Sequence, residues 1–180
     1  TKKFSILTSL TIVADGKKST VRSIIKTPVY KKNYKHSALF VNFNHTKNLN
    51  NTAYEIFLKT GPLAILPAKS KHVKSYTSSL IWSNNTSFLE SLTNIDNDLR
   101  KKIIEEKIKD YVGDILDINQ FGIFKLSAHL NAKFYEKRMV YLGDSAHSIH
   151  PIAGQGWNLG VRDVKNIFDQ ILYAKKMVLI

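Results

Sequence analysis

The stretch RMVYLGDSAHSIHPIAGQGWNLGVRD, which runs from Arg138 to Asp163, decides the fold of this chain of 180 residues. Its apolar run Met139–Leu142 predicts a buried strand that ends at Gly143 and Asp144. A loop of small residues then leads to a Gly-Gln-Gly triplet and to an amphipathic helix that is expected to run from residue 158 towards residue 176. The apolar residues at helical spacing are Leu159, Val161, Val164, Ile167, Phe168, Ile171 and Leu172. A strand, a carboxylate, a glycine loop and a helix start predict a cofactor cradle, because the first N–H groups of a helix lack partners within it and attract anionic groups.

A simpler interpretation of this stretch is that Asp144 caps a turn and that the glycines only permit tight loop geometry. The number of matching positions favours the cofactor cradle. The stretch resembles the second flavin-contacting motif of the FAD-dependent aromatic hydroxylases, most closely that of the ubiquinone-biosynthesis hydroxylases, whose pattern is GD-x-A-H-x-x-x-P-x-x-G-Q-G-x-N-x-G-x-x-D. The residues that fit this pattern are Gly143, Asp144, Ala146, His147, Pro151, Gly154, Gln155, Gly156, Asn158, Gly160 and Asp163.

A second motif, ADGKKSTVR, occupies residues 14–22. By itself it predicts an ordinary turn at Asp15 and Gly16, followed by a short helix that Ser19 caps. It also resembles the DG motif of the same family, in which an Asp-Gly pair is followed by Ser and then Arg. This resemblance implies that Asp15, Gly16 and Arg22 belong to the cofactor site, near the FAD pyrophosphate and the path of NAD(P)H.

The segments between the two motifs predict a largely antiparallel sheet, because short β-branched and aromatic runs alternate with turn residues. The predicted strands are Phe4–Val13, His36–His45, Tyr54–Leu58, Leu63–Leu66, Ser75–Trp82 and Gln120–Leu126. Residues Asp96–Tyr111 predict a helix that ends at Gly113. Its predicted buried face consists of Leu99, Ile103, Ile104 and Ile108.

The resemblance implies an α+β or α/β chain, a fragment of a p-hydroxybenzoate-hydroxylase-like FAD-binding fold. Residues 1–30 are then an FAD-domain portion with the DG motif, and residues 31–130 a substrate-side β-sheet domain with a helix. Residues 131–180 are a second FAD-domain portion, with the later motif and the helix that follows it. The family's G-x-G-x-x-G motif, which holds the ADP half of FAD, does not occur in the sequence. We therefore expect the central-to-C-terminal part of a longer protein.

The resemblance also assigns roles within the later motif. Asp144 would accept a hydrogen bond from a ribityl hydroxyl, and Pro151, the predicted catalytic residue, would shape the pocket beside the flavin ring. The remaining predicted cofactor-binding residues of this motif are Gly143, Gly154, Gln155, Gly156, Trp157 and Asn158. Trp157 departs from the family, which more often has a smaller apolar residue at this position.

The implied function is that of an FAD-dependent aromatic-ring monooxygenase in ubiquinone biosynthesis. NAD(P)H or another donor would reduce the flavin, molecular oxygen would be the second substrate, and a polyprenylated phenol would be hydroxylated. The alternative is a non-catalytic flavoprotein-like remnant or an interaction module, since half of the cofactor site is missing from the sequence.

The residues of the same loop also invite two other site chemistries. His147 and His150, with Asp144, invite a metal site, but two histidines three apart suit a helix, and Pro151 follows them in a loop. We therefore predict no metal and expect His147 to be a structural hydrogen-bonding residue. Ser145 with His147 invites hydrolysis, but the sequence has no G-x-S-x-G elbow.

The composition of the chain favours some classes of binding partner and excludes others. Its 27 basic and 14 acidic side chains give a formal net charge of +13, which favours polyanions or anionic membrane surfaces. The lysines are scattered and no RNP-like or helix-turn-helix signature occurs, so we expect solvated charge and peripheral membrane contact, with no nucleic acid. The absence of cysteine excludes disulfides and thiolate metal sites, so the expected compartment is a reducing cytoplasm. The periphery of the inner membrane, or contact with a ubiquinone-biosynthesis complex, is the alternative that the charge and the resemblance leave open.

Overall fold

The structure is a computed structural model, and it describes residues 5–69, 75–150 and 154–178. The chain divides into two compact units. The first unit consists of residues 1–33 and 127–180, and the second of residues 34–126. Two long strands, β2 (Val29–His45) and β6 (Ile115–Asn131), contribute residues to both units.

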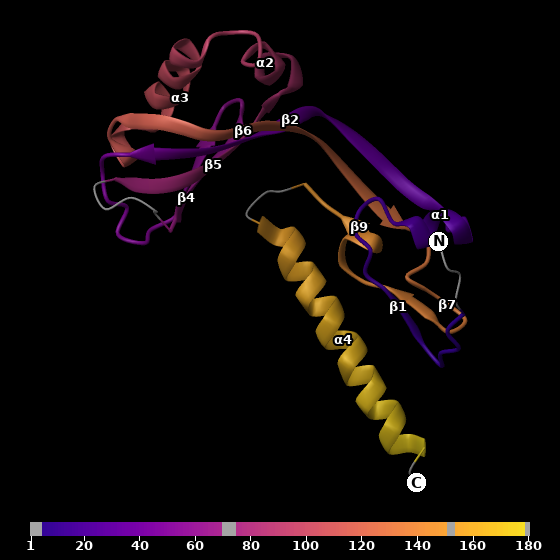
Figure 1. Cartoon of the computed structure of the whole chain (residues 1–180). Coiled ribbons are helices and arrows are strands. Elements are labelled where there is room, and N and C mark those ends of the chain that lie inside the picture. Colours follow the sequence, from indigo (N-terminus) through magenta and orange to yellow (C-terminus); the bar gives the residue numbers. More distant parts are fainter. Residues whose placement is uncertain (1–4, 70–74, 151–153, 179–180) are drawn as a thin grey trace. The chain divides into compact units, whose positions relative to one another are not determined.

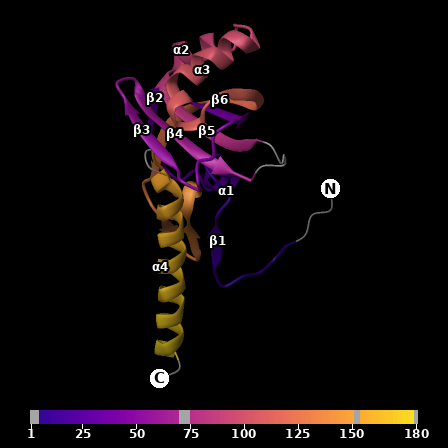
Figure 2. The same cartoon turned by 90° about the vertical axis from the view of Figure 1, so that its left-hand side faces the viewer.

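The second unit is an antiparallel sheet with two helices. Its strands are β3 (Tyr54–Leu58), β4 (Gly61–Ala68), β5 (Tyr76–Asn85) and the parts of β2 and β6 that lie within residues 34–126, in the order β3-β4-β5-β2-β6. The helices α2 (Thr86–Ser91) and α3 (Asn97–Val112) lie together over one face of this sheet (Figures 1 and 2). The antiparallel sheet predicted from the sequence is confirmed.

The core of the second unit lies between this sheet and its helices. Side chains of alternate strand residues point to the same face, which brings Leu63 of β4 and Leu39 of β2 to either side of Trp82 in β5. The fully or almost fully buried core residues are Leu39, Val41, Phe43, Leu49, Leu63, Ile65, Leu80, Trp82, Leu89, Leu92, Ile104, Ile108, Val112 and Ile115.

Helix α3 begins and ends close to the predicted residues. The carboxylate of Asp96 accepts a hydrogen bond from the amide of Leu99 at 2.8 Å, which caps the helix start, and Gly113 ends it. The predicted buried face was wrong at Leu99, whose side chain is 46% exposed. Leu99 lies five residues before Ile104 and is therefore turned by about 140° around the helix axis. Val112 takes its place in the buried row.

Most strands differ in length from the prediction: β2 begins seven residues before His36, β5 ends three residues after Trp82, and β6 extends five residues beyond each end of the predicted strand Gln120–Leu126. The predicted strand Phe4–Val13 is limited, among the described residues, to β1 (Thr11–Val13). The predicted strand Leu63–Leu66 is longer, because β4 includes Pro62 and Pro67. Each proline is next to an end of β4, where the missing N–H group removes little of the ladder.

The first unit contains a small mixed sheet and a long helix (Figure 1). Strand β1 lies parallel to β8 (Met139–Tyr141), and β7 (Tyr135–Glu136) pairs with the other side of β8. The shorter elements are α1 (Thr20–Ile25), the 3-10 turn η1 (Gly143–Ser145) and β9 (His147–Ser148), which pairs with the end of β6. The helix α4 (Gln155–Val178) begins three residues earlier than the predicted segment.

Candidate functional site

The two predicted motifs meet because β1 and β8 are parallel neighbours, with Val13 paired to Tyr141. Parallel strands end at the same edge of a sheet, and ligands of α/β proteins commonly bind there. The chain leaves β1 through Ala14 and Gly16, and it leaves β8 through Gly143 and Asp144. All four of these residues line one cavity of about 770 Å³ within the first unit.

The N-terminal turn of α4 forms another wall of this cavity, with Gly156 and Trp157. Trp157 is 77% exposed, and its neighbour one turn further on, Val161, lines the same wall. The first four N–H groups of α4 have no acceptor within the helix, so the positive end of the helix dipole lies at the cavity. The cavity therefore favours a ligand that is planar or apolar in part and carries negative charge.

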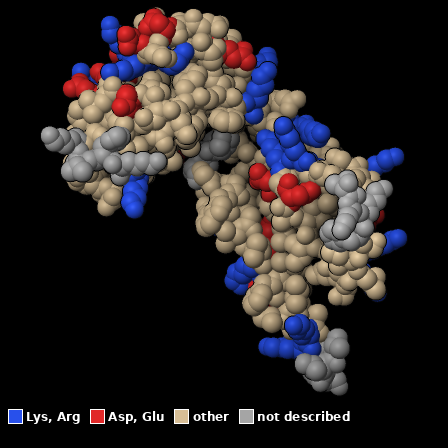
Figure 3. Space-filling model, in the orientation of Figure 1, with Lys and Arg blue, Asp and Glu red and all other residues tan. Residues whose placement is uncertain are grey.

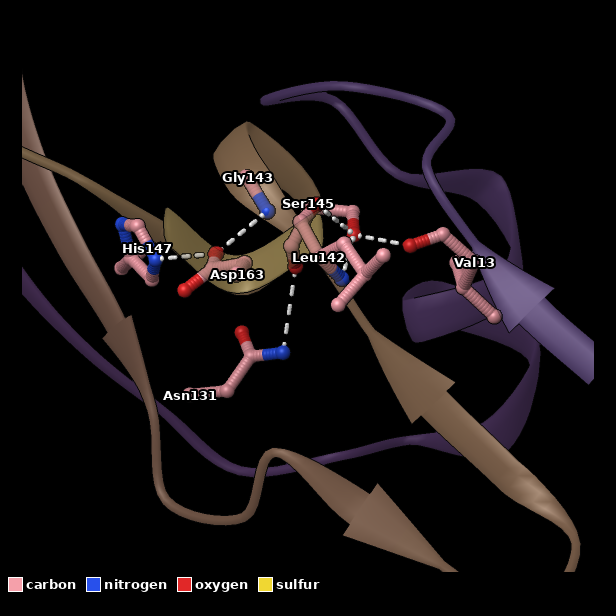
Figure 4. A network of polar contacts seen from close by, with 7 residues as sticks. All are labelled: Val13, Asn131, Leu142, Gly143, Ser145, His147 and Asp163. Carbon is pink, nitrogen blue, oxygen red and sulfur yellow. Dashed lines mark hydrogen bonds and ion pairs between the residues drawn. The ribbon is translucent and has the colours of Figure 1, made fainter. Parts of the chain in front are cut away.

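Asp163 fixes α4 to the loop that carries Asp144 (Figure 4). Its Oδ2 atom accepts a hydrogen bond from the amide of Gly143 at 2.8 Å and lies 2.7 Å from Nε2 of His147. One carboxylate oxygen thus contacts the residue before Asp144 and a residue after it. The expectation that His147 is a structural hydrogen-bonding residue agrees with this contact.

A pair of glycines lies where the backbone of α4 packs against the loop. A Cβ atom on Gly143 would lie 3.8 Å from the Cα atom of Gly160, which is ordinary van der Waals contact. Gly143 has a φ of +55°, in the left-handed region that favours glycine. Gly143 is therefore needed for the backbone turn after β8.

Ser145 joins the same loop to β1 (Figure 4). Its fully buried hydroxyl donates to the carbonyl oxygen of Val13 at 2.6 Å and to that of Leu142 at 2.8 Å, sharing one proton between the two. The carbonyl oxygen of Ser145 accepts a hydrogen bond from Nδ2 of Asn131 at 3.1 Å. These contacts hold the ends of the two parallel strands in register at the cavity.

Residues of the DG motif stabilise the turn and the helix that follow β1. Asp15 accepts a hydrogen bond from the amide of Val21, and the hydroxyl of Ser19 lowers the pKa of the Asp15 carboxyl. The Ser19 hydroxyl also accepts from the amide of Arg22 at 3.0 Å, which confirms Ser19 as the cap of this helix. Arg22 is buried, with its guanidinium beside Ser145 and His129.

The structure brings six of the predicted site residues to the cavity, and they lie in both motifs: Gly16, Gly143, Asp144, Gly154, Gly156 and Trp157. Asp15, Arg22, Gln155 and Asn158 are not among the lining residues. Pro151, the predicted catalytic residue, lies outside the described residues. The binding roles of all these residues stay predictions.

Sequence reasoning gave no role to Asp163, Ser145 or His129, although Asp163 belongs to the later motif. Their roles come from contacts between segments far apart in the chain, since Ser145 and Val13 are 132 residues apart. The only signal in the sequence was the type of residue: short polar side chains within an otherwise apolar or glycine-rich stretch.

The loop does not combine its histidines and carboxylates into a metal centre. Across residues 5–69, 75–150 and 154–178 no three His, Cys, Asp or Glu side chains gather in a way that could hold a metal ion. His147 contacts Asp163 and stacks edge-on against Phe134, with ring centroids 6.0 Å apart. The Ser145 hydroxyl, which a Ser-His hydrolase would need as its nucleophile, is fully buried and donates to the carbonyl oxygens of Val13 and Leu142.

The glycine positions test whether a flavin fits the cavity. A Cβ atom placed on Gly16, Gly154 or Gly156 would meet no heavy atom within 4 Å, so these backbones border open space. A planar ring can approach a backbone closely where no side chain intervenes. Together with the exposed carboxylate of Asp144 and the start of α4, these features fit a dinucleotide cofactor with a planar ring.

In the part of the chain that the structure describes, the charged side chains and the hydropathy of the helices do not point to a further binding surface beside this site. On the face shown in Figure 3, Lys and Arg side chains lie at separate places, with Asp and Glu side chains among them. None of the helices within the described ranges is both long enough and apolar enough to cross a membrane.

A family model described as FAD binding domain matches residues 2–176 of the chain. Ubiquinone hydroxylase UbiL of Rhodospirillum rubrum is 27% identical over 168 residues, covering 93% of this chain and 38% of that protein. The 3-demethoxyubiquinol 3-hydroxylase of Escherichia coli is 28% identical over 170 residues, covering 94% of this chain and 42% of that protein. The chain thus spans less than half the length of these curated relatives.

Solved structures show the same fold. PqsL of Pseudomonas aeruginosa, in complex with 2-aminobenzoylacetate, matches with a TM-score of 0.71 and 20% identity, over 93% of this chain and 46% of that one. The p-nitrophenol 4-monooxygenase PnpA of Pseudomonas putida matches with a TM-score of 0.65 and 16% identity, over 93% and 42%. The predicted α+β fold of the p-hydroxybenzoate-hydroxylase type is confirmed.

Proposed function

The chain belongs to the FAD binding domain family, and on this premise we propose that it carries the flavin site of an FAD-dependent monooxygenase that hydroxylates the aromatic ring of a polyprenylated phenol in ubiquinone biosynthesis. The observation that carries the proposal is the cavity where β1, β8 and the start of α4 meet. The names of two relatives, both hydroxylases of ubiquinone biosynthesis, support the substrate class.

The residues of the cavity would hold the flavin in three ways. The exposed carboxylate of Asp144 would accept a hydrogen bond from a ribityl hydroxyl. The N–H groups of Trp157 and Asn158 would stabilise negative charge on the reduced ring, because they belong to the unpaired first turn of α4. Gly154 and Gly156 leave the space into which the ring would fit.

FAD, when bound, supplies the redox chemistry, which transfers electrons from NAD(P)H to molecular oxygen and one oxygen atom to the aromatic ring. The chain's own contribution is to bind and orient the cofactor and to exclude water from it. We propose that Pro151 shapes the pocket beside the ring, as the resemblance implies.

We further propose a division of labour between the two units. The first unit would hold the cofactor, since both motifs and the cavity belong to it. The antiparallel sheet of the second unit would be the substrate-side domain, as the resemblance implies. The net charge of +13 would favour the cytoplasmic surface of the inner membrane, where a polyprenylated substrate is concentrated.

The experiment that tests the proposed function uses the longest natural protein that contains these residues. Bound flavin is measured by its absorbance, and NAD(P)H oxidation is followed with and without a short-chain prenylated phenol. We expect bound FAD, oxidation stimulated by the phenol, and one added oxygen atom in the product by mass spectrometry. Bound FAD without hydroxylated product, or no bound flavin at all, would contradict the proposed function and favour the non-catalytic alternative.

A further inference from the structure

Arg22 is a buried cation that is held by neutral groups. Its side chain is 9% exposed, and none of the ion pairs of the described residues includes it. Its Nη1 atom donates to the carbonyl oxygen of Ser145 at 2.9 Å and lies 3.1 Å from Nε2 of His129. Its Nη2 atom donates to the carbonyl oxygen of Lys17 at 2.5 Å. A buried guanidinium is expensive unless its donors are satisfied, so these contacts must form together.

The contact with Arg22 fixes the protonation state of His129. A guanidinium can only donate, so Nε2 of His129 must accept, and the imidazole must be neutral with its proton on Nδ1. Burial and then the charges of Arg22 and Lys17 lower the pKa of His129, while Asp144 raises it. A protonated His129 would place two donors and two positive charges against each other.

The charged groups that act on His129 come from three segments. They are Arg22 from α1, Lys17 from the turn after β1 and Asp144 from η1. A second histidine, His147, lies on β9, the strand paired with the end of β6, and its Nε2 atom contacts Asp163. It therefore needs its own control.

The contacts of Arg22 connect the two walls of the cavity. Lys17 directly follows Gly16 in the wall that continues β1, and Ser145 directly follows Asp144 in the wall that continues β8. We propose that Arg22 and His129 are positioning residues. The guanidinium of Arg22, held by the neutral imidazole of His129, connects the cavity wall that contains Gly16 to the wall that contains Asp144. Protonation of His129 releases that connection. The proposal rests on the proposed function only for the identity of the ligand.

A first experiment needs no ligand and no variant. Hydrogen-exchange protection of the α1 amides, corrected for the intrinsic pH dependence, is measured on the chain between pH 7.5 and pH 5 together with the NMR titration of His129. We expect protection of Thr20–Ile25 to fall as His129 takes up its proton. Protection that stays constant while His129 titrates would overturn the proposal.

Variants then separate His129 from its neighbours. His129→Gln keeps an acceptor that does not titrate, so we expect α1 protection to persist at pH 5, whereas His147→Gln should leave the pH dependence of protection as it is. Arg22→Ala should remove protection at pH 7.5, and Arg138→Ala, which changes an exposed side chain, should not. A loss of protection at pH 5 in folded His129→Gln equal to that of the wild type would overturn the proposal.

The affinity for FAD, measured by titration on the longest natural form, gives the second readout. We expect the dissociation constant of the wild type to rise by roughly tenfold between pH 7.5 and pH 5. At pH 7.5 the dissociation constant of Arg22→Ala should exceed that of the wild type by a similar factor. The dissociation constant of His129→Gln should not change with pH. If FAD does not bind at any pH while α1 protection follows His129, the proposed function fails and the connection stands. If FAD binds and neither its affinity nor the hydrogen-exchange protection of α1 depends on pH, the proposed connection fails and the proposed function stands.

Discussion

Oδ2 of Asp163 lies 2.7 Å from Nε2 of His147, and the two side chains are 25% and 14% exposed. The same oxygen accepts the amide hydrogen of Gly143. Through this atom a residue in the third turn of α4 holds both sides of Asp144 in the loop. The first turn of the helix is thereby directed at the cavity, so the position of the proposed flavin site depends on a carboxylate that need not touch the cofactor.

Replacing Asp163 should loosen the first unit. In Asp163→Ala both hydrogen bonds are lost, and we expect the free energy of unfolding to fall by about 2 kcal/mol, as for hydrogen bonds to charged groups. Asp163→Asn keeps an acceptor for Gly143 and should lose less. Urea unfolding measures both. The control is Asp169→Ala on the same helix, whose exposed pair with Lys165 is worth roughly 0.3 to 0.5 kcal/mol. Equal effects at the two positions would contradict the role of Asp163.

Ser145→Ala should destabilise the connection between β1 and β8. The change removes the buried hydroxyl that contacts the carbonyl oxygens of Val13 and Leu142, and we expect a loss of about 1 to 3 kcal/mol. Thermal unfolding of the variant is compared with that of Ser23→Ala, an exposed residue whose hydroxyl makes one hydrogen bond, to the carbonyl oxygen of Ser19, so the loss should be smaller, about 0.5 kcal/mol. A Ser145→Ala protein as stable as Ser23→Ala would show that this contact does not hold the strands.

Much of this arrangement could be predicted from the sequence, because its signals are local. The apolar run at Met139, the glycines after it and the helical spacing beyond give β8, the loop and α4. The Asp96 cap and Gly113 give the ends of α3. The proximity of the two motifs followed only from the family resemblance, since the parallel pairing of β1 with β8 joins residues more than 120 apart.

Other features could not be predicted because tertiary contacts decide them. Leu99 and Ile104 are equally apolar, and only the docking of α3 on the sheet decides which is buried. The predicted strand Leu63–Leu66 stopped short of Pro62 and Pro67, yet the ladders with β3 and β5 include both prolines. The Arg22 contacts with His129 and Ser145 depend on three segments that meet only in the folded chain.

Acid should destabilise the second unit through His45. This side chain is fully buried, its Nε2 lies 2.9 Å from the Ser78 hydroxyl, and burial lowers the pKa of His45 below its ordinary value of 6.5. Below pH 6.5 the unfolded chain binds a proton that the folded chain does not, so the free energy of unfolding should fall as the pH decreases. Urea unfolding followed by the fluorescence of Trp82 measures this loss. A His45→Gln protein should show a weaker acid dependence, and an unchanged one would contradict the assignment.

Gly156 should separate stability from cofactor binding. It is the second residue of α4, and a Cβ atom there would meet no heavy atom within 4 Å, so Gly156→Leu should raise helix stability slightly, by less than about 1 kcal/mol. The same side chain would occupy the cavity and should weaken FAD binding, which a flavin titration measures. Gly143→Ala should have the opposite effect on stability. The φ of +55° at Gly143 is unfavourable for alanine, so the free energy of unfolding should fall by about 1 to 2 kcal/mol. Unchanged FAD affinity in Gly156→Leu would place the cofactor elsewhere.

The central claim is that FAD occupies the cavity beside Trp157, and the indole NMR signals of the chain test it most directly. The sequence has two tryptophans: Trp157 lines the cavity, and Trp82 is buried in the core of the other unit. With ¹⁵N-labelled tryptophan, and with Trp157→Phe to assign the two indole signals, FAD is titrated into the chain. The account predicts that the Trp157 signal shifts saturably while the Trp82 signal stays in place. Saturable binding of FAD with no shift of the Trp157 signal would contradict it.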